Sequence, residues 1–185
     1  MSLRTQTLGF LSAALLTLGA PAAASAATAT ATANVRGGSL SLTTSAAPSF
    51  GVTLDGTDQT GTYTVPATVT DSRGTGAGWN LTLTSTQFST GGPTPSTLST
   101  GASSLTGVTN ACVSGTCTAP TNAITYPVAV PAGTVAPAAV KYFNAAASTG
   151  KGKFTNTPSV DVSVPANSDA GTYTSTLTLA AVSGP

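Results

Sequence analysis

Residues 62–88 read TYTVPATVTDSRGTGAGWNLTLTSTQF, and two segments within them alternate between apolar and polar side chains. The first, 62–70, alternates Tyr, Val, Ala and Val with threonine and proline. The second, 79–86, alternates Trp, Leu and Leu with asparagine and threonine. Successive side chains of a strand point to opposite faces, so a period of two indicates half-buried strands. The stretch therefore predicts two strands joined by a glycine-rich turn, with Trp79, the one tryptophan of the chain, on the apolar face of the second.

The N-terminal residues have the pattern of a secretory signal peptide. Arg4 gives a positive start, residues 8–18 form an apolar run, and Ala24-Ser25-Ala26 is a small-residue cleavage site. The apolar run is too short to span a bilayer as a stable helix, so we expect no membrane span after cleavage. The chain is then divided into a signal peptide at 1–26, a flexible Ala/Thr leader at 27–34 and one domain at 35–185, which is long enough to bury a core.

Charged residues make up 6% of the chain, and the sequence contains neither histidine nor glutamate. There are six basic and five acidic side chains, and because Arg4 lies in the signal peptide the remaining chain is neutral. Binding of nucleic acid requires a basic surface that neutralises phosphates, so we exclude this class of partner. Without histidine a Ser-His-Asp triad is impossible and the usual zinc ligands are missing. We therefore expect no enzyme, no cofactor and no metal site.

Three aspartates have structural interpretations that are simpler than a chemical role. Asp55 and Asp58 lie in segment 55–61, which is rich in turn residues. An EF-hand calcium loop would need more oxygen ligands and a terminal glutamate. Asp71 precedes Arg73 by two residues, which favours a turn cap or an ion pair over a general base.

Cys112 and Cys117 are the two cysteines of the chain. In an exported protein an even pair predicts a disulfide. Closing so short a ring contributes about 2 kcal/mol in the chain-entropy model, so we expect a local clip on a loop. Four residues separate the pair, which excludes a CxxC redox motif.

The rest of the domain predicts further strands separated by turns. We expect them where apolar residues alternate, at 35–42, 50–54, 124–130, 152–155, 160–164 and 173–179. Pro127 lacks a backbone donor and so places its strand at a sheet edge. Residues 90–107 predict a long surface segment, and 135–147 predict a short helical turn or a loop. About seven to nine strands with turn signals between them predict an all-β fold, a single antiparallel β-sandwich.

These features resemble the WxL domain family of secreted bacterial surface proteins. Four runs carry the match: Gly-Ser-Leu-Ser-Leu at 38–42, Val-Thr-Asp-Ser-Arg-Gly at 69–74, Gly-Trp-Asn-Leu at 78–81, and 164–176 with its Ala-Gly-Thr-Tyr. The Trp-x-Leu motif alone is short, and its context makes the match more specific. The resemblance covers most of the domain and implies a cell-surface protein that associates non-covalently with the cell wall through peptidoglycan.

One departure concerns a second Trp-x-Leu motif, which the family commonly carries near the C-terminus. The corresponding strand here reads Leu-Thr-Leu-Ala-Ala at 177–181, without tryptophan. If wall binding needs both tryptophans, this chain binds weakly or differently. If the motif mainly supports the fold, leucine replaces the tryptophan with little consequence. The candidate wall-binding residues are Trp79, Asn80, Leu81, Leu177 and Leu179.

Two interpretations of Trp79 stay open at this point. It shares an apolar face with Leu81 and Leu83, which favours packing in the core. Alternatively it lies open and stacks on a sugar ring of the glycan, with neighbouring asparagine and threonine side chains supplying hydrogen bonds.

The leading functional hypothesis is a secreted surface protein held at the wall through a WxL-like peptidoglycan-binding domain. Its expected partners are peptidoglycan or another wall glycan, and other surface proteins. The alternative is a structural subunit of a surface fibre, layer or multi-protein complex without wall-glycan binding, in which edge strands or the Ala/Thr leader pair with neighbours. A third hypothesis is a secreted module that binds a polysaccharide other than the wall. No lipoprotein cysteine or sortase signal is seen, so we expect attachment to be non-covalent.

Overall fold

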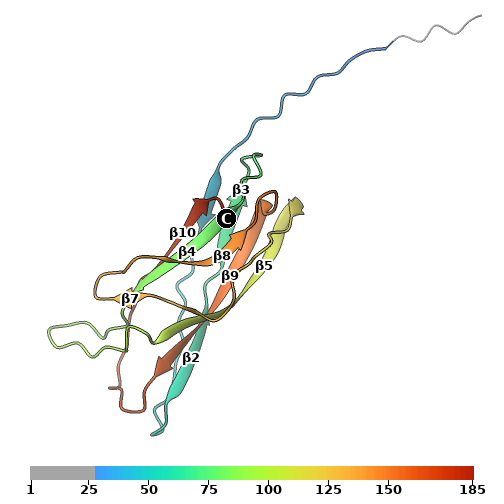
Figure 1. Cartoon of the computed structure of the whole chain (residues 1–185). Coiled ribbons are helices and arrows are strands. Elements are labelled where there is room, and N and C mark those ends of the chain that lie inside the picture. Colours follow the sequence, from blue (N-terminus) through green and yellow to red (C-terminus); the bar gives the residue numbers. More distant parts are fainter. Residues whose placement is uncertain (1–27) are drawn as a thin grey trace, which may run out of the picture. The chain divides into compact units, whose positions relative to one another are not determined.

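Two β-sheets face each other in a computed structural model that describes residues 28–185 (Figure 1). Val35–Pro185 form one compact unit. The described residues before it, 28–34, are exposed and carry no regular secondary structure. The predicted signal peptide at 1–26 lies outside the described residues. Among residues 28–185, no helix long and apolar enough to cross a membrane is found.

The larger sheet has six strands, which pair in the order β1-β3-β9-β5-β6, with β2 also pairing with β9. Their bounds are β1 Leu40–Thr43, β2 Gln59–Thr64, β3 Ala67–Asp71, β5 Ser103–Thr118, β6 Val128–Ala129 and β9 Lys151–Val164. The second sheet contains β4 Trp79–Thr86, β7 Ala132–Gly133, β8 Val140–Ala145 and β10 Leu177–Ser183. In it β4 pairs with β7, β8 and β10, and β4–β7 is the one parallel pair among the described strands. The predicted all-β sandwich is confirmed.

Strand β9 organises the larger sheet because β2, β3 and β5 all pair with it. Its side chains alternate between buried and less buried along most of its length. The predicted strand at 62–70 is two strands, β2 and β3, which lie one after the other along β9. The break falls at Val65–Pro66, since proline has no N–H to give to the ladder. Residues 152–155 and 160–164, predicted as separate strands, both belong to β9.

The core lies between the sheets and takes side chains from both. Its largest fully buried members include Trp79, Tyr142, Phe154, Leu81 and Leu83. Strand β4 runs through the middle of the second sheet and is buried at six of its eight positions. The strand predicted at 79–86 is therefore confirmed with the same bounds, and it supplies the centre of the core.

Several other predictions were wrong in detail. The strand predicted at 35–42 begins only at Leu40. Residues 50–54 form no strand, and β5 begins at Ser103, inside the predicted surface segment. The helical turn or loop expected within 135–147 is in part strand β8. At 124–130 only Val128–Ala129 is strand, although its predicted edge position is confirmed, since β6 ends the sheet order. The last strand begins at Leu177, and Thr174 makes only an isolated bridge to Ser89.

Candidate functional site

The candidate wall-binding residues lie on two neighbouring strands, β4 and β10. Their antiparallel register pairs Trp79 with Ser183 and Leu179 with Leu83, so the leucines of β10 lie several residues along from the tryptophan. Trp79 and Leu81 are 0% exposed and Asn80 is 7% exposed. Leu177 and Leu179 are half-buried. The register therefore does not bring the leucines beside Trp79.

Trp79 is held inside the domain by packing and by a hydrogen bond. Its indole Nε1–H donates to the backbone carbonyl of Gly150 at 2.8 Å, and its ring stacks on Phe143 at 5.8 Å between centroids. Gly150 has a φ of 69°, and a Cβ there would lie 2.6 Å from the indole nitrogen. No face of the indole is open to a sugar ring, so the structure has Trp79 in the packing role.

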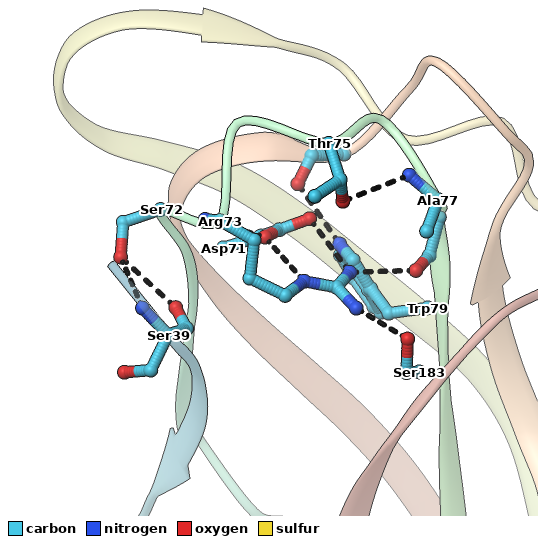
Figure 2. A network of polar contacts seen from close by, with 10 residues as sticks. Ser39, Asp71, Ser72, Arg73, Thr75, Ala77, Trp79 and Ser183 are labelled. Atoms are coloured by element: carbon cyan, nitrogen blue, oxygen red, sulfur yellow. Dashed lines mark hydrogen bonds and ion pairs between the residues drawn. The ribbon is translucent and has the colours of Figure 1, made fainter. Parts of the chain in front are cut away.

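The turn before Trp79 is fastened by an ion pair (Figure 2). Arg73 Nε donates to Asp71 Oδ1 at 2.9 Å, and its Nη2 donates to Asp71 Oδ2 at 3.0 Å and to the Gly78 carbonyl at 2.7 Å. Its Nη1 also donates to Ser183 Oγ, which ties the turn to the end of β10. The hydrogen bond from Arg73 lowers the pKa of Asp71 below its ordinary value of 3.8. The interpretation of Asp71 as an ion-pair partner is confirmed, and the Asp-Ser-Arg-Gly run serves the fold.

The predicted disulfide between Cys112 and Cys117 is formed. The expectation of a loop was wrong in detail, because both cysteines lie within β5, where the pairing with β9 shifts register between Cys112 and Thr118. Asp55 Oδ1 accepts hydrogen bonds from Thr57 and Gln59, as expected for a turn. Among residues 28–185 no group of three or more possible metal ligands is found.

A groove opens along one edge of the sandwich, which we call the aromatic groove. The outer strands β1 and β10 contact each other along part of this edge. After β1 the chain continues as an extended segment. The groove, of about 1030 Å³, lies between residues 44–54 of this segment and residues 168–177. Leu177 and Leu179 line it, whereas Trp79, Asn80 and Leu81 do not.

Four half-buried aromatic side chains line this groove: Phe50, Tyr63, Phe88 and Tyr173. Phe50 stacks on Tyr63 at 5.8 Å and meets Phe88 edge-on at 6.0 Å. The Tyr173 hydroxyl donates to the backbone carbonyl of Asp169 at 2.9 Å, which fixes the ring beside the 168–171 turn. Burial raises the pKa of the Tyr63 hydroxyl above its ordinary value of 10.0. The groove thus presents aromatic rings together with phenol hydroxyls.

The groove also has polar groups on its walls. Hydroxyl side chains line it on both sides: Thr44, Ser49, Thr53, Ser168, Thr172, Thr174, Ser175 and Thr176. Within the described chain, the backbone of residues 47–54 makes no hydrogen bond. This segment is held through Phe50, Val52 and Leu54, which pack on the core with alternate side chains. Its free backbone groups and the hydroxyls can bind a polar ligand, while the rings cover its apolar faces.

Sequence reasoning missed the aromatic groove. The alternation of Phe50, Val52 and Leu54 predicts a strand, whereas in the structure these residues form no strand and line the groove. Nothing in the local sequence joins these residues to Phe88 and Tyr173, which come from distant parts of the chain.

A family model described as WxL domain, surface cell wall-binding, matches residues 30–185. Comparison with curated proteins and with solved structures found no match.

Proposed function

Because the chain belongs to the WxL domain family, we propose that it binds peptidoglycan without a covalent link and that the aromatic groove is the binding site. Membership of this family makes it a cell-surface protein that associates with the wall. We further propose that the chain is exported through the signal peptide at 1–26. Its role in this proposal is binding, without catalysis.

The observation that carries the proposal is the gathering of four aromatic rings in one open groove. The C–H faces of a sugar ring pack well on aromatic faces, and sugar hydroxyls pair with threonine, serine and backbone groups. Ligand sites commonly enclose about 300–1,000 Å³, and the groove, at about 1030 Å³, lies at the upper end of that range. An extended glycan segment fits a site of this size and shape better than a single sugar does.

Co-sedimentation of the purified protein with peptidoglycan sacculi, stripped of accessory polymers, tests this proposal. The variant is Tyr173→Ala, which removes a ring from the groove. The matched control is Val182→Ala on β10, because Val182 is 45% exposed and does not line the groove. Losing one aromatic contact of about 1 kcal/mol lowers affinity roughly fivefold. Circular dichroism and thermal melting establish that both variants are folded.

Three results are possible. Weaker pelleting of folded Tyr173→Ala, with Val182→Ala unchanged, supports the groove. Equal pelleting of all three proteins means that the wall is bound through another surface, and the groove is then rejected. If the unmodified protein does not pellet, the peptidoglycan proposal fails. The hypothesis of a structural subunit in a larger surface complex then takes its place, and light scattering at rising concentration tests it.

A further inference from the structure

The acidic side chains gather at the end of the sandwich that holds the aromatic groove. Asp169 lines the groove, and its Oδ2 accepts a hydrogen bond from Ser96 Oγ at 2.6 Å. Asp58 Oδ1 accepts from the amide N–H of Ala166, just beyond the end of β9. Asp55 follows Leu54, which lines the groove. Asp161 lies on β9 three residues before Val164, another lining residue. Four of the five acidic residues of the chain are therefore near this end.

The basic side chains lie mostly at the opposite end. Lys151 and Lys153 are among the first residues of β9, whose fourteen residues correspond to about 40 Å at about 3.3 Å per residue. Arg73 follows β3, and the last residue of β3 pairs beside Lys151, at Gly152. Arg36 lies at the same end, because the next residue, Gly37, packs so closely on Arg73 that an added Cβ would contact the Arg73 carbonyl oxygen. In Figure 1, β2 lies at one end of the sandwich, and the end of β3, which leads to Arg73, lies at the other.

No lysine or arginine lines the groove within the described residues. The last basic residue of the described chain, Lys141, is exposed on β8 and is not a lining residue; it pairs with Thr82 of β4, whose partner on β10, Ala180, follows the lining residue Leu179. Salt at 0.1 M screens charges that lie more than about 10 Å apart, so the lysine at the start of β9, about 40 Å along the strand from Val164, does not assist an anion bound beside Asp169. A carboxylate or phosphate bound there would lie near Asp169 without a basic partner, which is unfavourable.

The unpaired backbone of residues 47–54 favours one kind of neutral group. An acetamido substituent has one N–H and one C=O, the same pair that a neighbouring strand would offer to free backbone groups. A sugar hydroxyl also donates and accepts, but it is a single atom, whereas the N–H and C=O of an acetamido group are held apart as in a peptide unit. An N-acetylated sugar chain therefore satisfies both the extended segment and the aromatic rings.

From the charge distribution and the free backbone together, we infer that the groove recognises the uncharged N-acetylated sugar chain of the wall and rejects its acidic peptide stems and anionic polymers. This inference rests on the proposed function, since it assigns the chemistry of the ligand to the same groove. Affinity for a neutral ligand changes little with salt, whereas binding of an anion to basic groups weakens as salt rises.

Isothermal titration calorimetry with four soluble probes tests the inference, at 20 mM and 500 mM salt. The first probe is the β-1,4-linked hexamer of N-acetylglucosamine, which has the acetamido groups and no charge. The second is cellohexaose, which has the same linkage without acetamido groups. The third is hexagalacturonate, which is anionic. The fourth is a tetrasaccharide of alternating N-acetylglucosamine and N-acetylmuramic acid, whose lactyl carboxylates add charge to the acetylated chain.

We expect the N-acetylglucosamine hexamer to bind with equal affinity at both salt concentrations. Cellohexaose should bind about tenfold more weakly because the amide hydrogen bonds are lost. Hexagalacturonate should not bind, and the carboxylated tetrasaccharide should bind better at high salt than at low salt. Asp169→Lys should introduce binding of hexagalacturonate at low salt that high salt removes. Lys151→Ala, at the far end, should leave all four titrations unchanged.

The inference is overturned if hexagalacturonate binds the unmodified protein at low salt, or if cellohexaose binds as well as the acetylated hexamer. Failure of the acetylated hexamer to bind while sacculi still pellet the protein also overturns it, and leaves the proposed function standing. If neither the hexamer nor sacculi bind, the proposed function itself has failed, and the inference is rejected with it.

Discussion

Replacing Trp79 with phenylalanine separates the packing role of this residue from a role in binding the wall. The indole is 0% exposed, stacks on Phe143 and donates from Nε1 to the Gly150 carbonyl at 2.8 Å. Phenylalanine keeps an aromatic ring but has no N–H. The change therefore leaves a buried carbonyl without its donor and leaves a small void beside the ring.

The expected loss of unfolding free energy is the sum of these two effects. Leaving a buried carbonyl unpaired costs about 1–3 kcal/mol. A void of roughly 40 Å³, at about 24 cal/mol per Å³, costs about 1 kcal/mol more. The free energy of unfolding should fall by about 2–4 kcal/mol. For a domain of 150–250 residues each kcal/mol lowers Tm by about 2–4 °C, so a fall of about 10 °C is expected for Trp79→Phe.

Thermal melting followed by circular dichroism measures the loss of stability, and co-sedimentation with sacculi at 20 °C measures binding by the folded fraction. We expect Tm to fall and pelleting to stay unchanged, because the groove receives nothing from Trp79. A folded variant whose Tm stays within about 2 °C of the unmodified protein, and which no longer pellets, would refute the reasoning. Trp79 would then be a wall contact, and the packing described above would not be its role.

Three further changes test other parts of the fold. Asp71→Asn should lower the free energy of unfolding at neutral pH. Because the pKa of Asp71 is depressed in the folded state, the difference in unfolding free energy between this variant and the unmodified protein should shrink as pH falls below 3.8. Acid titrations followed by circular dichroism measure this difference. Replacing Cys112 and Cys117 with serine should cost about 2 kcal/mol in guanidinium unfolding and leave pelleting unchanged. Gly150→Ala should lower Tm more than Gly92→Ala, since both glycines have positive φ but only a Cβ at Gly150 meets the indole.

Period-two alternation predicted the strands where one face is buried and the other is open. It succeeded at 79–86 for this reason. It missed β8 because four consecutive residues there, 142–145, are buried, so that apolar and polar positions do not alternate. It overpredicted at 50–54 because alternation records where side chains pack. It does not record whether the backbone pairs: in this segment the side chains reach the core, while the backbone makes no hydrogen bond to any other part of residues 28–185.

The candidate site was predicted less well than the fold. The alternation of Trp79, Leu81 and Leu83 predicted that Trp79 lies on an apolar face, and this favoured packing in the core. Phe50, Tyr63, Phe88 and Tyr173 come from four segments, and the pairing of β2 with β9 and of β4 with β10 decides that they meet. Those pairings link residues about a hundred positions apart, which no local pattern specifies.

The missing second tryptophan bears on what the Trp-x-Leu motif does in this chain. Leu179 lies directly opposite Leu83 on β4, and directly paired residues of an antiparallel ladder share one face. Leu83 is 0% exposed, so a leucine at 179 is sufficient to cover it, and the core is closed there without tryptophan. At the other end of β4, Trp79 likewise faces inward and is fastened through the Gly150 carbonyl. Both positions therefore serve packing. The proposed function assigns wall recognition to side chains that solvent reaches, and Leu179 belongs to that proposal only as a residue that lines the aromatic groove.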